Sequence, residues 1–161
     1  GDAVQILPSG LTTSVADIQL HGRSLTCAVS EQSVTILLED EIDISRGDMI
    51  VKADEAPRVT KQVETMMCWL GDVPLDLNRK YIVRQTTRET KALLAGIGYR
   101  LDINELTRAA AGKLAMNDIG KVSLKFAQPL FVDAYAENRA TGAFIVIDEA
   151  TNNTVGAGMI L

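Results

Sequence analysis

Apolar and polar side chains alternate along Gly120-Lys121-Val122-Ser123-Leu124-Lys125-Phe126. Val122, Leu124 and Phe126 fall on one side of an extended chain, because successive side chains of a β-strand point to opposite faces. This pattern predicts a strand with one buried and one solvated face. The expected ladder is interrupted at Pro129, which has no backbone N–H to donate, before a short continuation at residues 130–132.

The same extended character recurs on both sides of this strand. Val, Ile and Thr number thirteen each, a level of β-branching that suits pleated sheets. Residues 89–103 admit a helix by composition, but Gly96 and Gly98 favour a strand. Residues 34–38 are continuously apolar, which predicts a strand buried on both sides or closing a barrel. The strands expected elsewhere cover residues 2–7, 13–20, 25–29, 33–38, 49–52, 59–70, 81–84, 143–147 and 154–161.

One short helix or helical turn is expected within residues 104–116. Residues 105–111 are the best run of helix formers in the chain, and Gly112 follows them as a stop. The sequence therefore predicts an all-β fold with at most one short helix.

A domain boundary is expected near Ala56. Residues 53–57 are small and acidic and end in Pro57, a composition typical of a link between domains. Residues 57–161 then contain about six strands, the size of a small closed barrel. Residues 1–56 form a separate, smaller unit.

Composition and charge exclude some classes of function. The 161 residues are 47% hydrophobic and carry a net charge of −5, with an isoelectric point of about 4.9. The chain contains no apolar run long enough to span a membrane and no signal-peptide layout, so we expect a cytoplasmic protein without a membrane partner. The acidic balance and the absence of a basic patch argue against nucleic-acid binding.

No motif points to a reaction. The chain has no phosphate-binding loop, dinucleotide fingerprint, zinc-protease helix or paired-cysteine motif. The one histidine, His21, is interpreted as an exposed turn residue. The acidic residues 39–48 lack the spacing of a calcium loop, so they are expected to form a solvated loop with Ile42 and Ile44 turned inward.

Other residues that attract attention have ordinary interpretations. Cys27 and Cys68 are expected to be ordinary core or surface thiols, and Trp69 is expected to pack inside a barrel. The tripeptide 46–48 matches an adhesion motif and residues 152–154 match a glycosylation acceptor, but both have meaning only in secreted proteins. We therefore expect no catalytic, cofactor-binding or metal-binding residue in this chain.

Several segments, in order and at matching spacing, resemble one family: residues 2–10, 38–48, 141–148 and 154–159. The family is the large, GTP-binding subunit of bacterial sulfate adenylyltransferase, which is similar to elongation factor Tu. Residues 99–104 and 117–120, together with the acidic string 38–48, resemble the sulfate-activating branch specifically.

The resemblance implies two small β-barrels, as in domains 2 and 3 of elongation factor Tu. Residues 1–56 would be a truncated second-domain barrel and residues 57–161 a complete third domain. The GTPase domain, with its GTP and magnesium, would be missing, so the chain is expected to be an inactive fragment.

In the family, a catalytic small subunit converts ATP and sulfate to adenosine 5′-phosphosulfate and pyrophosphate, driven by GTP hydrolysis on the large subunit. The resemblance implies that these barrels dock the GTPase domain and the small subunit and couple them. Two alternatives stay open at this point: a tRNA-docking barrel pair of a translation elongation factor, and a free-standing barrel enzyme with the acidic loop as its site.

Overall fold

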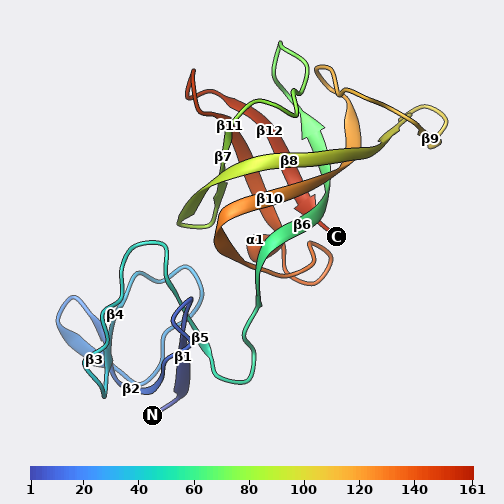
Figure 1. Ribbon diagram of the computed structural model, residues 1–161. Helices are drawn as coiled ribbons and strands as arrows, with labels where there is room; N and C mark the ends of the chain where they lie inside the picture. The colour runs from blue at the N-terminus through green and yellow to red at the C-terminus, as the bar shows by residue number, and fades with distance from the viewer. The chain divides into compact units, whose positions relative to one another are not determined.

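The computed structural model describes residues 1–161 and consists almost entirely of β-strands (Figure 1). The expectation of an all-β fold with at most one short helix is confirmed. The elements are β1 (Ala3–Leu7), β2 (Thr12–Leu20), β3 (Arg23–Leu25), β4 (Thr35–Leu38), β5 (Met49–Lys52), β6 (Arg58–Trp69), β7 (Tyr81–Gln85), β8 (Arg88–Leu101), β9 (Arg108–Ala109), β10 (Ile119–Val132), α1 (Arg139–Gly142), β11 (Ala143–Asp148) and β12 (Thr154–Ile160).

The chain divides into two compact units, residues 1–56 and residues 57–161, called unit 1 and unit 2 below. Unit 1 is an open antiparallel sheet in the order β3-β2-β1-β5, with β4 also paired to β2. Strand β5 pairs only with β1, and β4 pairs only with β2. Because no pairing joins β4 to β5, the sheet does not close, and strand edges stay open.

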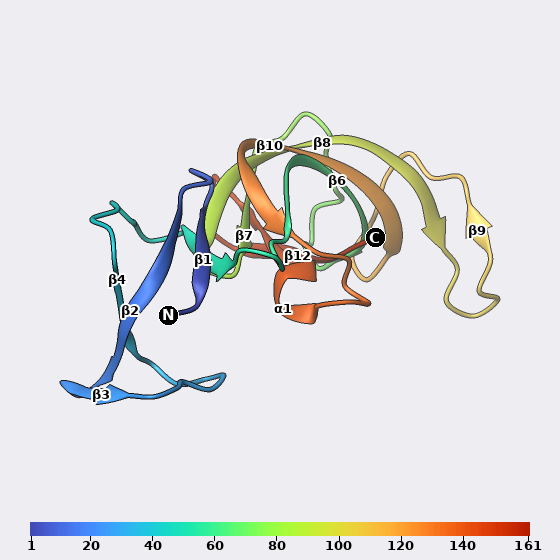
Figure 2. The ribbon, with the colours of Figure 1, turned by 90° about the horizontal axis from the view of Figure 1, so that it is seen from below.

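Unit 2 is a closed barrel. Its strands follow the order β10-β6-β12-β11-β7-β8, and pairing of β8 with β10 completes the ring of six. All of these pairings are antiparallel. Figure 2 shows β8 and β10 curving together along one side of the barrel, while the short hairpin formed by β8 and β9 extends away from it.

The core lies inside unit 2. The inward residues predicted for β10, which are Val122, Leu124 and Phe126, are no more than 6% exposed. On β6, Val63, Thr65, Met67 and Trp69 are buried along one face, as the period of two predicts. Of the buried apolar side chains, nineteen belong to unit 2 and three, Val4, Ile6 and Leu7, belong to unit 1.

The interruption predicted at Pro129 is confirmed in the pairing of β10 with β6. The register runs to Lys125, opposite Gln62, and resumes at Leu130, opposite Thr60. Strand β10 bends there by a bulge, as expected where a residue cannot donate to the ladder. The strand favoured over a helix at residues 89–103 is also confirmed as β8.

The helix expected within residues 104–116 is wrong. The Asp102 carboxylate accepts hydrogen bonds from the backbone N–H groups of Asn104 and Glu105, and the Asp102 N–H donates to the Thr107 carbonyl. Leu106 has a φ of +54°, which ends any right-handed helix. These bonds close the hairpin of β8 and β9, so tertiary pairing overrides helix propensity.

The short helix is α1 instead. Its N-cap is Asn138, whose side chain accepts a hydrogen bond from the Ala140 N–H. An asparagine with extended backbone geometry at this position satisfies one of the free donors of a first helical turn. The cap was the only local signal, and a helix of four residues leaves no periodic pattern.

Two expectations for unit 1 are also wrong. A strand was predicted at residues 25–29, but β3 ends at Leu25, and Val29 and Gln32 close a turn through two hydrogen bonds. The strand at residues 33–38 forms as β4 but is not buried on both sides, since Ile36 and Leu37 are 38% and 43% exposed. The reason is that β4 pairs with β2 alone and no second layer covers it.

Candidate docking surface

The residues considered for catalysis lie apart and exposed. His21 occupies a turn at the end of β2, with a φ of +50°, as expected. In the acidic segment 39–48, Asp48 accepts a hydrogen bond from the Ser45 N–H at 2.9 Å and Asp40 accepts one from the Thr13 hydroxyl at 2.8 Å. Asp48 thus organises a turn and Asp40 fastens the segment to β2. Ile42 and Ile44 are half-buried, as predicted.

No group of three or more His, Cys, Asp or Glu side chains is placed to hold a metal ion. No helix is long and apolar enough to cross a bilayer. Cys27 and Cys68 are both free thiols. Residues 46–48 form the turn before β5, and residues 152–154 lie in and after the turn between β11 and β12.

Trp69 is a packed barrel residue, as predicted. Its ring is 2% exposed and meets the ring of Tyr81 edge to face, with 5.6 Å between centroids. The indole N–H donates to the Val73 carbonyl at 2.8 Å, which satisfies its one polar atom. It offers no surface to a ligand.

The feature that stands out is on the outer wall of the barrel. The strand registers align side chains from five neighbouring strands into one row, which we call the apolar row. It runs across β10, β6, β12, β11 and β7 as Ile119, Cys68, Ala157, Ile145 and Arg84. Its first four members are apolar, whereas residues on the solvated face of a sheet are normally polar.

A second line lies beside the apolar row. Met66, Met159 and Ala143 are paired across β6, β12 and β11. Met159 is 41% exposed, and the Met66 sulfur accepts a weak hydrogen bond from the Tyr99 hydroxyl at 3.6 Å. Methionine side chains are flexible and polarisable, so they adapt well to a partner surface.

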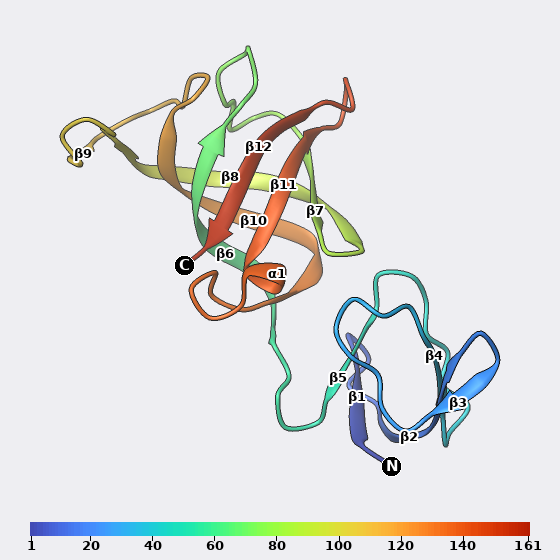
Figure 3. The same cartoon turned by 180° about the vertical axis from the view of Figure 1, so that it is seen from behind.

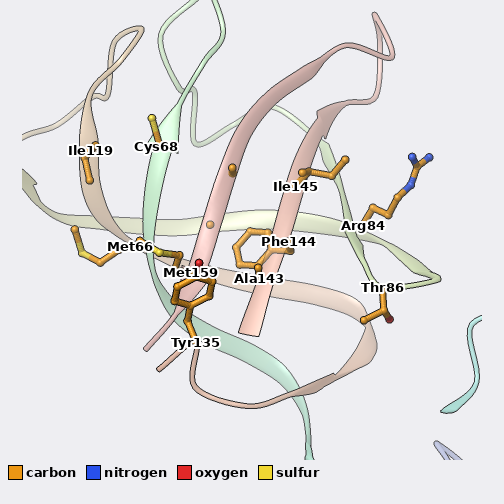
Figure 4. A pocket seen from close by; sticks show the side chains of 12 residues that line it. Met66, Cys68, Arg84, Thr86, Ile119, Tyr135, Ala143, Phe144, Ile145 and Met159 are labelled. Atoms are coloured by element: carbon orange, nitrogen blue, oxygen red, sulfur yellow. The ribbon is translucent and has the colours of Figure 1, made fainter. Parts of the chain in front are cut away.

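These residues line a shallow cavity of about 600 Å³. Figure 4 shows Met66, Met159 and Tyr135 at one end of the cavity and Arg84 and Thr86 at the other. Figure 3 shows the strands that carry the cavity, with β6, β12, β11 and β7 side by side. The floor consists of apolar side chains, and polar groups are confined to the rim.

The charges at the rim are already paired. At the end of the apolar row, the Arg84 guanidinium contacts the Glu89 carboxylate at 2.5 Å. At the end of the second line, Lys121 contacts Glu64 at 3.1 Å. A hydrogen bond from the Ser123 hydroxyl, followed by the Lys121 ammonium, lowers the pKa of Glu64. The surface therefore presents apolar area and no unpaired catalytic group.

The sequence pattern could have indicated this surface only in part. Residues 66 and 68 alternate with the buried face of β6 and are themselves apolar, which is unusual for a half-solvated strand. Their alignment with residues on β11 and β12 depends on register between distant segments, and that register becomes visible only in the structure.

A closed six-stranded barrel preceded by a second small β unit is the architecture of the barrel domains that accompany GTPases of the elongation-factor type. Residues 62–161 match the GTP-eEF1A C-terminal domain-like family, and the chain belongs to that family. In the solved structure of sup35 complexed with GDP, the same fold covers 99% of this chain and 40% of that one, with a TM-score of 0.84 at 14% identity.

The curated relatives specify the branch. The chain is 46% identical over 161 residues to sulfate adenylyltransferase subunit 1 of Alteromonas mediterranea, which matches all of this chain and 34% of the relative. It is 44% identical to the bifunctional enzyme CysN/CysC of Mycobacterium tuberculosis, over all of this chain and 26% of the relative. The resemblance to the sulfate-activating branch is confirmed, and the chain spans about a quarter to a third of the length of these relatives.

Proposed function

We propose that this chain is the C-terminal barrel region of the GTP-binding subunit of sulfate adenylyltransferase. Residues 1–56 would be the later part of its second domain and residues 57–161 its third domain. The parent would help convert ATP and sulfate to adenosine 5′-phosphosulfate and pyrophosphate, driven by GTP hydrolysis, in the cytoplasm. The barrels would contribute docking and coupling, with no active site of their own.

The apolar row is the observation that carries this role. An apolar hollow on the outer surface that is rimmed by polar groups is typical of an interaction site, and permanent interfaces are more apolar than dissociable ones. A domain of the same polypeptide is a permanent neighbour. We therefore assign the apolar row to the GTPase domain of the parent, where GTP and magnesium would bind.

Coupling requires an element with two arrangements that both sites bias. A barrel whose ring of strands closes on itself moves as a rigid body, since bending it would break pairings around the ring. We propose that unit 2 changes its contacts with the GTPase domain as GTP is hydrolysed and transmits that change to the catalytic small subunit.

The first test is titration calorimetry of this chain with magnesium and GTP. No binding is expected, because neither unit contains a phosphate-binding loop. Binding at micromolar GTP would contradict the assignment of the nucleotide to another domain.

The second test uses the full-length subunit with its catalytic partner. Ile145→Ser combined with Met159→Ser places two hydroxyls on the apolar surface, and Val59→Ser serves as a matched control on β6. We expect more GTP hydrolysed per adenosine 5′-phosphosulfate formed in the double variant and no change in the control. Unchanged coupling in the double variant would remove the apolar row from the proposal.

A tRNA-docking role in translation is not favoured. The Alteromonas mediterranea relative is sulfate adenylyltransferase subunit 1, and the net charge of this chain is −5. Phosphate contacts release counterions, so salt-dependent binding of aminoacyl-tRNA by this chain would reverse the choice.

A further inference from the structure

A second patch lies on the barrel strands β8 and β10, which cross the front of Figure 1. Leu93 on β8 is paired with Lys125 on β10. Lys80 directly precedes Tyr81, which pairs with Ala92, so the antiparallel register places Lys80 on the opposite side of Leu93. Leu93 is thus flanked by a lysine on each neighbouring chain segment, with about 10 Å between the two flanking backbones.

A third lysine completes the patch. Lys91 lies two residues from Leu93 and therefore on the same face of β8. All three lysines line a cavity of about 270 Å³ whose other walls are Ala92, Leu93, Phe126 and Ala127. We call this cavity and its three lysines the lysine patch.

The charges of the lysine patch are not balanced within the fold. Glu149 is the acidic group facing it, and its carboxylate contacts the Lys91 ammonium at 2.6 Å. That hydrogen bond from Lys91, together with the positive charges of Lys91 and Lys80, lowers the pKa of Glu149. One carboxylate against three ammonium groups leaves an excess of two positive charges, in a chain whose net charge is −5.

The apolar side chain at the centre of the lysine patch is exposed to solvent. Leu93 is 55% exposed, among the more exposed large apolar side chains of the barrel strands. Like charges near one another on a sheet are destabilising. Neither Leu93 nor the three lysines contribute to the barrel core.

We propose that the lysine patch docks an acidic segment of a separate protein chain, with one apolar side chain of that segment seated on Leu93. Carboxylates on either side of the apolar residue would meet Lys80 and Lys125. A charged, polar-rimmed surface of this kind suits a dissociable partner, because complementary charge raises the association rate more than the final affinity. This inference rests on unit 2 alone and holds whichever reaction the parent catalyses.

Nucleic acid fits the patch less well. Proteins that bind single-stranded nucleic acid along its phosphate backbone use an extended basic groove and aromatic side chains on which the bases stack. This patch has three lysines, no arginine, and a buried rather than exposed aromatic ring at Phe126, which is 6% exposed.

The test is fluorescence anisotropy of this chain with a fluorescein-labelled peptide in which glutamates flank a central phenylalanine. Lys80→Gln with Lys125→Gln is the main variant. Lys61→Gln with Lys113→Gln is the matched control, because it removes the same charge from elsewhere on unit 2. Leu93→Ser tests the apolar contact, and thermal unfolding of each variant checks that the barrel is intact.

We expect the main variant to weaken peptide binding about tenfold, Leu93→Ser about threefold, and the control less than twofold. A peptide with serine in place of phenylalanine should lose about what Leu93→Ser loses. Equal weakening by the main variant and the control would overturn the proposal, since attraction would then follow net charge. No peptide binding, or tighter binding of labelled oligothymidylate of equal length, would also overturn it.

Discussion

The ring of Phe144 lies directly against Gly158, so that a Cβ on Gly158 would overlap three of the ring carbons. The two residues are paired across β11 and β12, and both are buried. Gly158 therefore gives Phe144 the space it fills inside the barrel, below the wall that carries Met159 and Ala157.

Gly158→Ala is expected to lower the free energy of unfolding of unit 2 by about 1–3 kcal/mol, because the added methyl overpacks the core. Gly96→Ala on β8 is the matched control, since nothing lies within 4 Å of a Cβ there. The control should be neutral or slightly stabilising. Urea titration followed by Trp69 fluorescence measures both, and equal midpoints for the two variants would contradict the packing argument.

Gln85 is expected to hold three segments together. Its side-chain amide donates to the carbonyls of Phe131 and Thr141, both at 2.6 Å, while its own Oε1 has no partner. Gln85→Leu would leave two buried carbonyls without donors, at a cost of about 2–3 kcal/mol. Gln62→Leu, at an exposed position on β6, should change the unfolding free energy by less than about 0.5 kcal/mol.

The stability of unit 2 is expected to fall in acid through Asp148. Burial of this carboxyl opposes its ionisation, but the backbone N–H groups of Thr151 and Ala150 and the Arg79 guanidinium at 2.7 Å outweigh burial and lower its pKa. A lowered folded-state pKa stabilises the fold above the unfolded value of about 3.9, and this stabilisation is lost as pH falls through the lower folded value.

Asp148→Asn should therefore destabilise unit 2 at pH 7. The difference in unfolding temperature between this variant and the unsubstituted chain should become smaller below about pH 4. Glu105→Gln, at an exposed hairpin carboxylate, is the control and should show no such convergence. Thermal unfolding at several pH values gives the answer. A difference that stays constant down to pH 2 would show that the carboxyl charge is not responsible.

The two units are expected to unfold separately. Unit 1 buries three apolar side chains, whereas unit 2 buries nineteen, and small cores give low stability. Trp69, the only tryptophan, reports on unit 2 alone. Hydrogen exchange in β1 and β2 should therefore become fast at a urea concentration below the Trp69 transition, and coincident transitions would contradict this.

Strand positions could be predicted from sequence wherever a local period was complete. Val122, Leu124 and Phe126 alternate with polar residues and are buried, and residues 63–69 behave in the same way. The prediction failed at residues 104–116, where a local hairpin forms in place of a helix. Ala109 pairs with Arg100 in the hairpin closed by Asp102 and Thr107, and this pairing outweighs the helix propensity of the Ala-rich run 109–111.

The prediction that residues 34–38 are buried on both sides was wrong for another reason. Apolar character shows what a strand could bury, while exposure depends on which layers are present to cover it. The apolar row and the lysine patch were inaccessible to sequence reasoning on the same ground, because Cys68 with Ile145, and Lys80 with Lys125, meet only through the register of intervening strands.

The closure of the barrel between β6 and β12 sets the order in which unit 2 is completed during synthesis. Strand β6 is the first strand of unit 2 to leave the ribosome, yet Trp69 pairs with Gly156 and Thr65 pairs with Ile160. The inner face of β6 cannot be fully enclosed until nearly ninety more residues have been translated. A nascent chain that stalls before residue 154 would expose both an unpaired strand edge and the apolar side chains of Met67 and Trp69, the combination that chaperones recognise and that drives aggregation.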